Sequence, residues 1–474
     1  MPLPPIQKTA MGNNVCIVDD VTFRYFEKSE RNILEHFSLD IKEGETVVIL
    51  GESGCGKSTL ANIICGLYPE NGGFLINGSV KIDGLEIKDV PPRERREKIS
   101  VVFQNPDLQF CMGNLRDELR FCLENAAFDA DEMDSRIEAF ADAYSVSSLL
   151  DRPFSTLSGG EKQKASLCAA MILKSKVLVL DEPFANLDKV SRNSFLDLLE
   201  KKRLEDPETT IIAIDHKAEN WAGFTPRWIV LGDKGRIVSD GTAYPSLNTY
   251  EDYFAPPVLH KSQSAKPFLI LNEASIRPSK KEKPILKAAG LSIKPGDMIA
   301  LLGPSGSGKT TLFLTLLGIK PYEGSIIIDG KELRQQKRKD IYKSIGIVFQ
   351  NPSNQFIAST VQDEAKPADK ELLESFGLAN YSRYSPYMLS QGQQRKLGVI
   401  SMIAGKQRLL LLDEPTYGQD VKSTASIIRS LTERTEKGLS VIFSTHDEDL
   451  AALYADRIWR ISNGRIYETD KSIG

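Results

Sequence analysis

Several protein classes are excluded by what this sequence lacks. No apolar run approaches the roughly 20 residues that a membrane-spanning helix needs. The first residues, MPLPPIQKTA, contain no basic start followed by an apolar stretch, which argues against a signal peptide. The 60 Lys and Arg residues do not outnumber the 64 Asp and Glu residues, so the charge gives no reason to expect a nucleic-acid partner. We therefore expect a cytoplasmic chain that reaches a membrane only through a partner.

Cysteine and histidine are also scarce. None of the six cysteines forms a CxxC pair, which disfavours zinc and iron–sulfur centres. We expect free thiols, as is usual in a reducing cytosol. The chain has only four histidines, and two of them follow apolar segments at matching places in the two halves of the sequence.

Repetition organises the chain. Its 474 residues, 41% hydrophobic and 26% charged, fit a folded protein of two to four domains. Five sequence features occur twice in the same order, which indicates a duplicated domain. They are GESGCGKST (51–59) and GPSGSGKTT (303–311), VFQNPDLQF (102–110) and VFQNPSNQF (348–356), LSGGEKQK (157–164) and LSQGQQRK (389–396), LVLDEP (178–183) and LLLDEP (410–415), and the histidines His216 and His446.

The repeat predicts the domain boundaries. Residues 13–241 form the first domain and residues 267–474 the second, and the stretch 242–266, with Pro, Ser and Asn and little periodicity, is expected to be a linker. The second domain is shorter between Gln350 and Ser390 than the first is between Gln104 and Ser158.

Short apolar runs predict the strands of a parallel sheet buried on both faces, with helices after Ser58 and Thr310. Each half therefore has an α/β fold with a mostly helical insert. We expect two insert helices in the first half, near 115–123 and 133–144, and one in the second, at 370–376. The predicted strands are 46–50, 177–180, 211–214, 298–302, 409–412 and 441–443.

Residues 51–58 and 303–310 both fit GxxxxGK[ST] between a strand and a helix. Backbone N–H groups of such a loop wrap phosphates, the lysine reaches the outer phosphates, and the following hydroxyl ligates Mg²⁺. The expected nucleotide-binding residues are Gly51, Gly54, Gly56, Lys57, Ser58 and Thr59 in the first half and Gly303, Gly306, Gly308, Lys309, Thr310 and Thr311 in the second.

An acidic pair ends one apolar strand of each half, where an α/β sheet places its ligand groups. The first carboxylate suits Mg²⁺, and the second is placed to orient and deprotonate an attacking water. The histidine after a later strand is expected to contact the γ-phosphate. These residues are Asp181, Glu182 and His216 in the first half and Asp413, Glu414 and His446 in the second.

Together these motifs resemble two ATP-binding-cassette (ABC) ATPase domains fused in one chain, and LSGGE at 157–161 is the most specific of them. The resemblance implies two tandem P-loop domains, each a RecA-like core with an antiparallel β subdomain and a helical subdomain. It also implies head-to-tail pairing of the halves, with each ATP held between one P-loop and the other half's signature. The signature contacts would be Ser390 and Gly392 for the site built on Lys57, and Ser158 and Gly160 for the site built on Lys309.

The same resemblance suggests further site residues. Gln104 and Gln350 match the glutamine that senses Mg²⁺ and the γ-phosphate, and Tyr25 matches the aromatic residue that stacks on adenine. The second half departs from the pattern, because Arg277 takes the aromatic position and Gln391 replaces a signature glycine. Neither change removes a carboxylate, so we expect both sites to hydrolyse ATP with Mg²⁺.

The two VFQNP motifs resemble those of energy-coupling-factor (ECF) transporter ATPases, which power uptake of water-soluble vitamins, their precursors, or cobalt and nickel. This implies a membrane-embedded transmembrane coupling subunit, a small substrate-binding membrane subunit, and a peripheral position on the cytoplasmic face of a prokaryotic membrane. The longer first insert is expected to anchor the membrane subunit more strongly.

Other members of the same superfamily remain alternatives: the fused ATPase of another importer, such as a sugar importer, or an ABC-F translation factor. The short linker and acidic chain argue against the latter. DNA-repair ATPases with zinc modules are disfavoured by the missing CxxC pairs.

Overall fold

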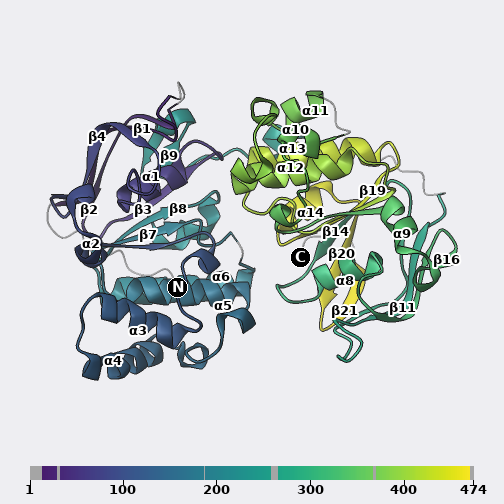
Figure 1. Cartoon of the computed structure of the whole chain (residues 1–474), viewed down its shortest axis with the longest axis horizontal. Helices are drawn as coiled ribbons and strands as arrows, with labels where there is room; N and C mark the ends of the chain where they lie inside the picture. Colours follow the sequence, from purple (N-terminus) through teal and green to yellow (C-terminus); the bar gives the residue numbers. More distant parts are fainter. Residues whose placement is uncertain (1–12, 29–31, 186, 258–264, 367–369, 470–474) are drawn as a thin grey trace. The chain divides into compact units, whose positions relative to one another are not determined.

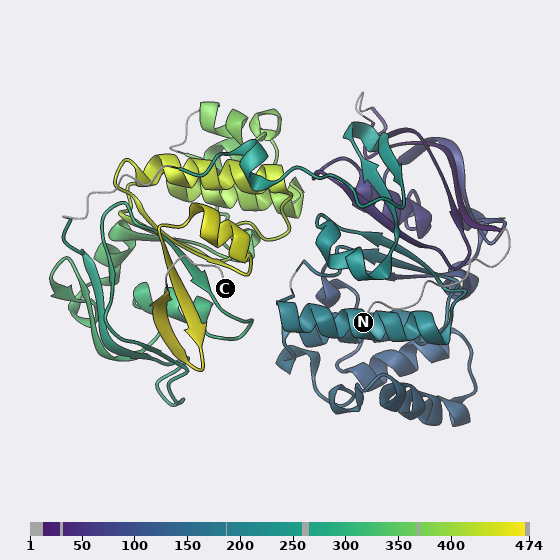
Figure 2. The same cartoon turned by 180° about the vertical axis from the view of Figure 1, so that it is seen from behind.

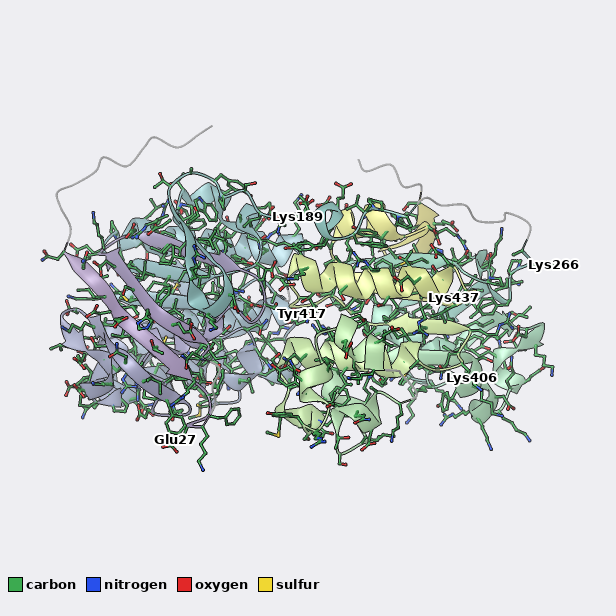
Figure 3. The ribbon with its side chains drawn as sticks, turned by 90° about the horizontal axis from the view of Figure 1, so that it is seen from above. Glu27, Lys189, Lys266, Lys406, Tyr417 and Lys437 are labelled. Carbon is green, nitrogen blue, oxygen red and sulfur yellow. The ribbon has the colours of Figure 1, made fainter. Side chains whose placement is uncertain are left out.

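The computed structural model describes residues 13–28, 32–185, 187–257, 265–366 and 370–469. The chain divides into two compact units between Leu247 and Asn248, within the stretch expected as a linker (Figures 1 and 2). Within the described ranges, no helix combines the length and the apolar character needed to cross a bilayer. Charged side chains such as those of Lys406 and Lys437 are exposed (Figure 3).

The first unit contains a six-stranded sheet in the order β10-β9-β3-β8-β7-β6 and a four-stranded sheet in the order β2-β1-β4-β5. In the larger sheet the strands from β9 to β6 run parallel and β10 is an antiparallel edge. The smaller sheet is antiparallel. The strands are β1 (Asn14–Arg24), β2 (Leu34–Lys42), β3 (Thr46–Gly51), β4 (Phe74–Ile82), β5 (Leu85–Glu86), β6 (Ile99–Val102), β7 (Val177–Asp181), β8 (Thr210–Ile214), β9 (Arg227–Leu231) and β10 (Ile237–Gly241).

The apolar runs form strands because both faces of the parallel sheet are covered. Along β3, Val48 and Leu50 belong to one buried cluster and Val47 and Ile49 to another, as the alternation of side chains along a strand requires. The predicted strands of this half are confirmed as β3, β7 and β8. The helices are α1 (Lys57–Ile64), α2 (Pro92–Lys98), α3 (Leu115–Asn125), α4 (Ala130–Ala143), α5 (Gly159–Met171) and α6 (Lys189–Glu205).

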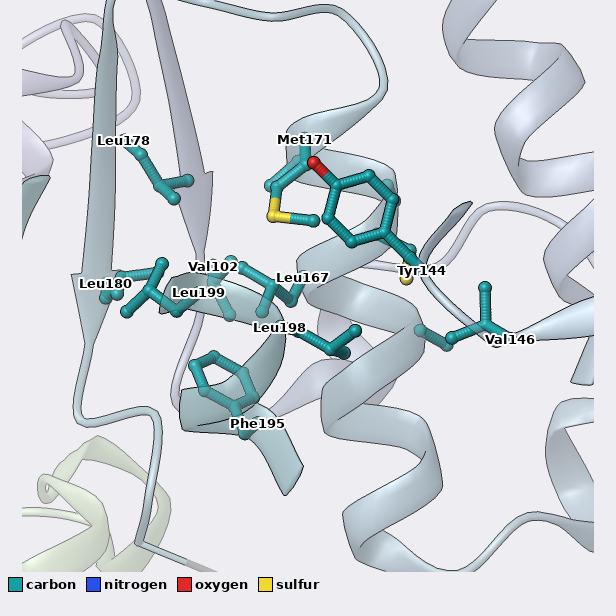
Figure 4. Close-up of a cluster of buried hydrophobic side chains, with 14 of the residues drawn as sticks. Val102, Tyr144, Val146, Leu167, Met171, Leu178, Leu180, Phe195, Leu198 and Leu199 are labelled. Atoms are coloured by element: carbon teal, nitrogen blue, oxygen red, sulfur yellow. The ribbon is translucent and has the colours of Figure 1, made fainter. Parts of the chain in front are cut away.

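The helical insert of the first half contains α3 and α4, which confirms the two expected helices. In Figures 1 and 2, α5 and α6 lie between the parallel strands and this insert. One buried cluster joins all three layers, as Figure 4 shows with Val102 of β6, Leu167 of α5 and Tyr144 at the end of α4. The insert is therefore packed onto the sheet through α5, the helix that begins within the LSGGE signature.

The second unit contains one sheet of 11 strands, in the order β16-β15-β11-β12-β21-β20-β14-β19-β18-β17 with β13 paired to β11. The strands from β20 to β17 run parallel, which confirms the strands predicted there. The strands are β11 (Leu269–Ile276), β12 (Leu286–Ala288), β13 (Leu291–Ile293), β14 (Met298–Leu302), β15 (Tyr322–Ile328), β16 (Lys331–Glu332), β17 (Ile345–Val348), β18 (Leu409–Leu412), β19 (Ser440–Thr445), β20 (Arg457–Ser462) and β21 (Arg465–Thr469).

The insert of the second half is shorter, as the sequence predicts. The expected stretch 370–376 is the helix α11, and one short helix that the sequence did not reveal, α10, precedes it. The first helix of this unit, α7, lies in the stretch 242–266 and packs beside α13. The helices are α7 (Tyr250–Tyr253), α8 (Lys309–Leu316), α9 (Arg338–Ser344), α10 (Val361–Glu364), α11 (Lys370–Ser375), α12 (Gln391–Ile403), α13 (Val421–Thr435) and α14 (Glu448–Tyr454).

The leucines of α3, in the longer first insert, do not supply the apolar docking surface that a stronger anchor would need. Leu115, Leu119 and Leu123 are all 0% exposed, because they pack toward the core and leave polar residues outside. The exposed apolar side chains near the insert of the second half are Ile357, Tyr384, Tyr387 and Met388, against Leu108 and Met112 in the first.

Candidate nucleotide-binding and catalytic sites

Each P-loop joins a buried strand to a helix whose first residue is the motif lysine. Before α1, Gly56 has φ 105°, and a side chain there would place its Cβ 2.7 Å from Leu34 Cδ2. Gly308 has φ 102° before α8. Only glycine suits such left-handed, crowded positions. The two loops thus end at the N-termini of helices, where unpaired N–H groups and the helix dipole favour phosphate.

The motif lysines are buried and turned onto their own loops. Lys57 is 4% exposed, and its Nζ donates to Gly51 O at 2.8 Å and to Glu52 O at 3.0 Å. Lys309 is 6% exposed and makes the matching pair of bonds to two carbonyls of its loop, at 2.7 and 3.2 Å. A cationic group is therefore held at the mouth of each phosphate loop.

A hydroxyl–carboxylate pair lies beside each lysine. Ser58 Oγ donates to Asp181 Oδ1 at 3.0 Å, and Thr310 Oγ1 donates to Asp413 Oδ2 at 2.5 Å. Ser444 Oγ also donates to Asp413 Oδ1, at 2.7 Å. Two oxygen ligands from the protein, with phosphate and water supplying the rest, are what Mg²⁺ takes in nucleotide sites, so these residues fit that ion.

In the first unit, the structure brings together the three residues expected at the γ-phosphate. Gln104 Nε2 donates to Glu182 Oε2 at 2.6 Å, and His216 Nε2 lies 2.8 Å from Glu182 Oε1. His216 Nδ1 lies 3.2 Å from Gly51 O, at the start of the P-loop. The glutamate is thus held between an amide and an imidazole at the carboxyl ends of neighbouring strands.

The second unit repeats this arrangement. Gln350 Nε2 donates to Glu414 Oε2 at 3.2 Å, and His446 Nε2 lies 2.8 Å from Glu414 Oε1. Lys309 Nζ is 3.3 Å from His446 Nε2 and 3.8 Å from Glu414 Oε1. Four groups that the sequence spreads over more than a hundred residues therefore meet at the carboxyl-terminal edge of the parallel strands.

Both glutamates have a left-handed backbone, with φ 46° at Glu182 and φ 51° at Glu414. Their amides are fixed by different acceptors, since Glu182 N donates to Ile214 O and Glu414 N to Ser444 Oγ, both at 2.9 Å. Such a conformation costs about 1–3 kcal/mol for a residue with a side chain and is concentrated at functional sites. The same cost at both glutamates fits a role that requires this orientation.

The carboxylates of the sites differ in pKa. Burial and the neighbouring Glu182 raise the pKa of Asp181 to about 6, and burial also raises the pKa of Asp413. Burial would raise the pKa of Glu414 as well, but the hydrogen bond with His446 and the charge of Lys309 outweigh it and lower that pKa. Glu414 is thus kept ionised, as a group that accepts a proton must be.

The positions expected to contact the adenine ring of ATP differ between the units. Tyr25 is 40% exposed, and its hydroxyl lies 2.7 Å from Thr59 Oγ1 in α1, so an accessible ring stands beside the P-loop helix. Arg277 instead donates to Glu323 Oε1 at 2.5 Å and to Glu282 O at 3.1 Å. These contacts hold the guanidinium of Arg277 against β15 and the stretch that precedes β12.

The signature residues begin a helix in each unit. Ser158 caps α5 and exchanges hydrogen bonds with Glu161, and Ser390 caps α12 and does the same with Gln393. A Cβ at Gly160 would lie 2.3 Å from Ser191 Oγ, so a side chain there would collide with α6. Both signatures are thus exposed helix N-termini with donors available for phosphate.

Sequence reasoning missed Arg395, which occupies in α12 the place that Gln163 has in α5. Arg395 is 5% exposed, its Nη2 donates to Gln350 O at 2.8 Å, and its guanidinium lies 4.5 Å from the centre of the Tyr417 ring. Burial lowers the pKa of Arg395 to about 10. The substitution of glutamine by arginine between the aligned repeats was the available signal.

With the geometry established, comparisons with known proteins define the class. The chain matches the family model described as ABC transporter twice, at residues 34–185 and 286–417. It is 32% identical to the "Putative HMP/thiamine import ATP-binding protein YkoD" of Bacillus subtilis (strain 168), over 93% of this chain and 88% of that protein. It is 31% identical to the "Putative ABC transporter ATP-binding protein SSO2030" of Saccharolobus solfataricus, over 95% and 92%.

One of the similar solved structures shows the same fold over nearly the whole chain. The archaeal ribosome recycling factor aABCE1, solved in complex with the ribosomal stalk protein aP1, aligns with a TM-score of 0.63 at 19% identity, over 94% of this chain and 89% of that one. The cbiO1 protein from Clostridium perfringens, part of the ABC transporter complex cbiONQ, aligns with a TM-score of 0.43 at 27% identity, over 48% and 88%.

The chain belongs to the ABC transporter family and carries two of its ATP-binding domains. The expected fold and enzyme class are thereby confirmed: it is a duplicated ABC ATPase that binds and hydrolyses ATP in support of transport, and proteins of this kind work with membrane subunits.

Proposed function

We propose that this chain is the energy-coupling ATPase of an ECF-type importer for a micronutrient, either a water-soluble vitamin or precursor, or cobalt or nickel. The name of the Bacillus subtilis relative, which refers to HMP and thiamine import, supports the vitamin class. Its partners would be a transmembrane coupling subunit and a small substrate-binding membrane subunit, with the chain peripheral on the cytoplasmic face of the membrane.

The two VFQNP motifs have the same local geometry, and this supports the proposal most directly. After Gln104, a short 3₁₀ turn (Pro106–Leu108) leads to Gln109, whose Oε1 accepts from Phe103 N at 3.2 Å. Gln109 Nε2 donates to Ser166 O of α5 at 3.1 Å. The motif thus connects the loop of Gln104, which contacts Glu182, to α5, the helix that begins at the signature.

The second VFQNP motif, at 348–356, folds in the same way. Gln355 Oε1 accepts from Phe349 N at 3.1 Å, and Gln355 Nε2 donates to Gly398 O of α12 at 3.1 Å. An apolar side chain is exposed at or just after each turn: Leu108, the last residue of the first turn, is 74% exposed, and Ile357, three residues beyond the second turn (Pro352–Asn354), is 96% exposed. A membrane subunit docked there would press on a loop bonded both to the catalytic glutamate and to the signature helix.

For hydrolysis, Glu182 and Glu414 are proposed as general bases, and His216 and His446 as the groups that orient each glutamate and the γ-phosphate. When bound, Mg²⁺ would neutralise charge on the phosphates. Its holders would be Ser58, Asp181 and Gln104 at one site and Thr310, Asp413 and Gln350 at the other.

We further propose that the halves pair head to tail, so that each signature completes the other half's site. The first site would combine its own phosphate loop with Ser390 and Gly392, and the second with Ser158 and Gly160. Signature helices that begin at exposed serines support this arrangement, because a phosphate needs such donors on its open side.

Purification of the intact complex from native membranes in mild detergent tests the proposal. Two hydrophobic membrane proteins, one of them small, should co-purify with the chain, and vesicles containing the complex should take up a vitamin or metal only with ATP. The Glu182→Gln, Glu414→Gln double variant is the matched control, which should assemble without transporting. Co-sedimentation with ribosomes, or co-purification with a sugar-binding protein, would contradict the ECF assignment.

A further inference from the structure

The two catalytic histidines stand on loops that are held by different contacts. In the first unit, Asp215 precedes His216, is 7% exposed, and accepts the backbone N–H groups of His216 at 2.6 Å and Lys217 at 3.1 Å. Its other oxygen accepts from Asn220 Nδ2 at 3.1 Å and Trp221 Nε1 at 2.8 Å. A buried carboxylate therefore organises this loop from within.

The second unit has no carboxylate at that place, because Thr445 precedes His446. Asp447, on the other side of the histidine, receives the contacts instead. Its N–H donates to Thr445 Oγ1 at 3.0 Å, and its Oδ1 caps α14 by accepting from Leu450 N at 2.9 Å. Its Oδ2 accepts from the hydroxyl of Tyr250 at 2.8 Å. A residue from α7, far earlier in the chain, thus reaches the second histidine loop.

The residues that follow Tyr250 are attached to α13 and α14. The ring of Phe254, one turn later, stacks on Tyr454 of α14 with centroids 5.5 Å apart and an angle of 9° between the rings. The Arg429 guanidinium of α13 lies 5.2 Å from the centre of the Phe254 ring and donates to Tyr253 O. Tyr454 also donates its hydroxyl hydrogen to Phe254 O. The segment 250–254 is therefore anchored on α13 and α14 at several points, and Tyr250 connects it to the loop that carries His446.

We propose that Tyr250 is a positioning residue for His446, so that the segment between the two ATPase domains helps to set the second catalytic site. This inference rests on the proposed role of His446, whose Nε2 lies 2.8 Å from Glu414 Oε1 and 3.3 Å from Lys309 Nζ. A hydroxyl that fixes Asp447 also limits the rotation of the adjoining backbone, and with it the direction of the imidazole.

The first test is kinetic and uses the full chain in its membrane complex. In a Glu182→Gln background, where ATP turnover comes from the second site, Tyr250→Phe should lower kcat by about 2- to 10-fold, the effect of one net hydrogen bond, with KM for ATP nearly unchanged. Tyr253→Phe is the matched control: it removes a hydroxyl from the same helix that accepts from Asn248 Nδ2 at 2.6 Å, and it should leave kcat unchanged.

The second test does not depend on activity. Because the chain has only four histidines, ¹³C-histidine labelling gives four imidazole signals, and the His446 signal is assigned by its loss in His446→Gln. Tyr250→Phe should shift or broaden the His446 signal, and Tyr253→Phe should not.

An unchanged His446 signal, an unchanged kcat, or an equal effect of Tyr253→Phe would overturn the positioning role. If instead Glu182→Gln and Glu414→Gln retained wild-type turnover, the proposed general bases would be wrong, and the histidine spectrum would still decide whether Tyr250 sets the imidazole.

Discussion

Gln104 Nε2 and Glu182 Oε2 lie 2.6 Å apart, so the amide at the end of β6 donates directly to the carboxylate at the end of β7. This bond joins the loop that carries an exposed leucine to the proposed general base. Movement of the loop would therefore act directly on the orientation of the glutamate.

Replacing the proposed bases should separate binding from hydrolysis. Glu182→Gln and Glu414→Gln together should slow phosphate release by roughly 10²–10⁴, because an amide accepts no proton from water. ATP binding, followed with a fluorescent analogue, should survive, since the lysines and hydroxyl–carboxylate pairs are untouched. Glu208→Gln, at an exposed position, serves as control and should have wild-type turnover. Near wild-type release by the double variant would rule out these carboxylates as bases.

Exchange of the signature serines should reveal which half serves which site. Ser390→Arg should reduce labelling of the first P-loop by a photoreactive ATP analogue, and Ser158→Arg that of the second, each by at least about tenfold. The reason is that a charged, bulky side chain would occupy the phosphate side of the helix N-terminus. Peptide mapping of the label is the readout. Loss of label from the P-loop of the same half would contradict head-to-tail pairing.

The cysteines should react at very different rates. Cys111 is exposed, whereas burial raises the pKa of both Cys16 and Cys168 to about 12, so these thiols are protonated and covered at neutral pH. A thiol reagent should modify Cys111 rapidly and the other two only after unfolding.

Within the first P-loop, Cys55 is 5% exposed and should react slowly. ATP should slow that reaction further, and alkylation should block the first site, because a bulky group would fill the loop. Mass spectrometry of partly modified protein checks both expectations. Equal sensitivity of ATPase activity to alkylation in Cys55→Ser would dismiss a role for this thiol.

The second half should dock to the membrane subunit at least as strongly as the first. Ile357 is 96% exposed, and the rings of its neighbour Phe356 and of Tyr387 lie 6.1 Å apart, which places a second exposed side chain beside it. Burying one such isoleucine contributes about 1.5–3 kcal/mol. Ile357→Asp should release more chain from membranes than Leu108→Asp in sedimentation assays. Greater release by Leu108→Asp would restore the first half as the main anchor.

The parts of the site that the sequence predicted share one property: their positions follow from strand ends and fixed motif spacing. Lys57, Glu182 and His216 each follow a buried strand, and parallel strands deliver their carboxyl ends to one edge. The sequence therefore predicted which residues meet before any distance was known.

The features that the sequence did not predict depend on contacts between segments that are far apart in the chain and leave no periodic pattern. The burial of Arg395 could not be predicted, because it depends on two hydrogen-bond acceptors from other segments, the carbonyls of Gln350 and Tyr417. The helix α7 could not be predicted, because four residues are too few to show a helical periodicity. Its position depends on the packing of this segment on α13 and α14. The leucines of α3 complete the core and not an outer surface, because α3 packs against α4 and α5, and that packing could not be predicted from the sequence.

The sheets of the two units differ in one junction, where β12 pairs with β21 through Lys287 beside Arg465 and Ala288 beside Ile466. In the described part of the first unit, the corresponding two sheets are hydrogen-bonded separately. The antiparallel portion of the second half is therefore joined to its core by main-chain bonds, whereas that of the first half is joined through side chains, by a shared buried cluster and by the bond from Arg227 Nη1 to Asp40 O. A small displacement of this portion would break main-chain bonds in the second half and only side-chain contacts in the first, and slower amide exchange at Ala288 than at Ile41 of β2 would reveal that difference.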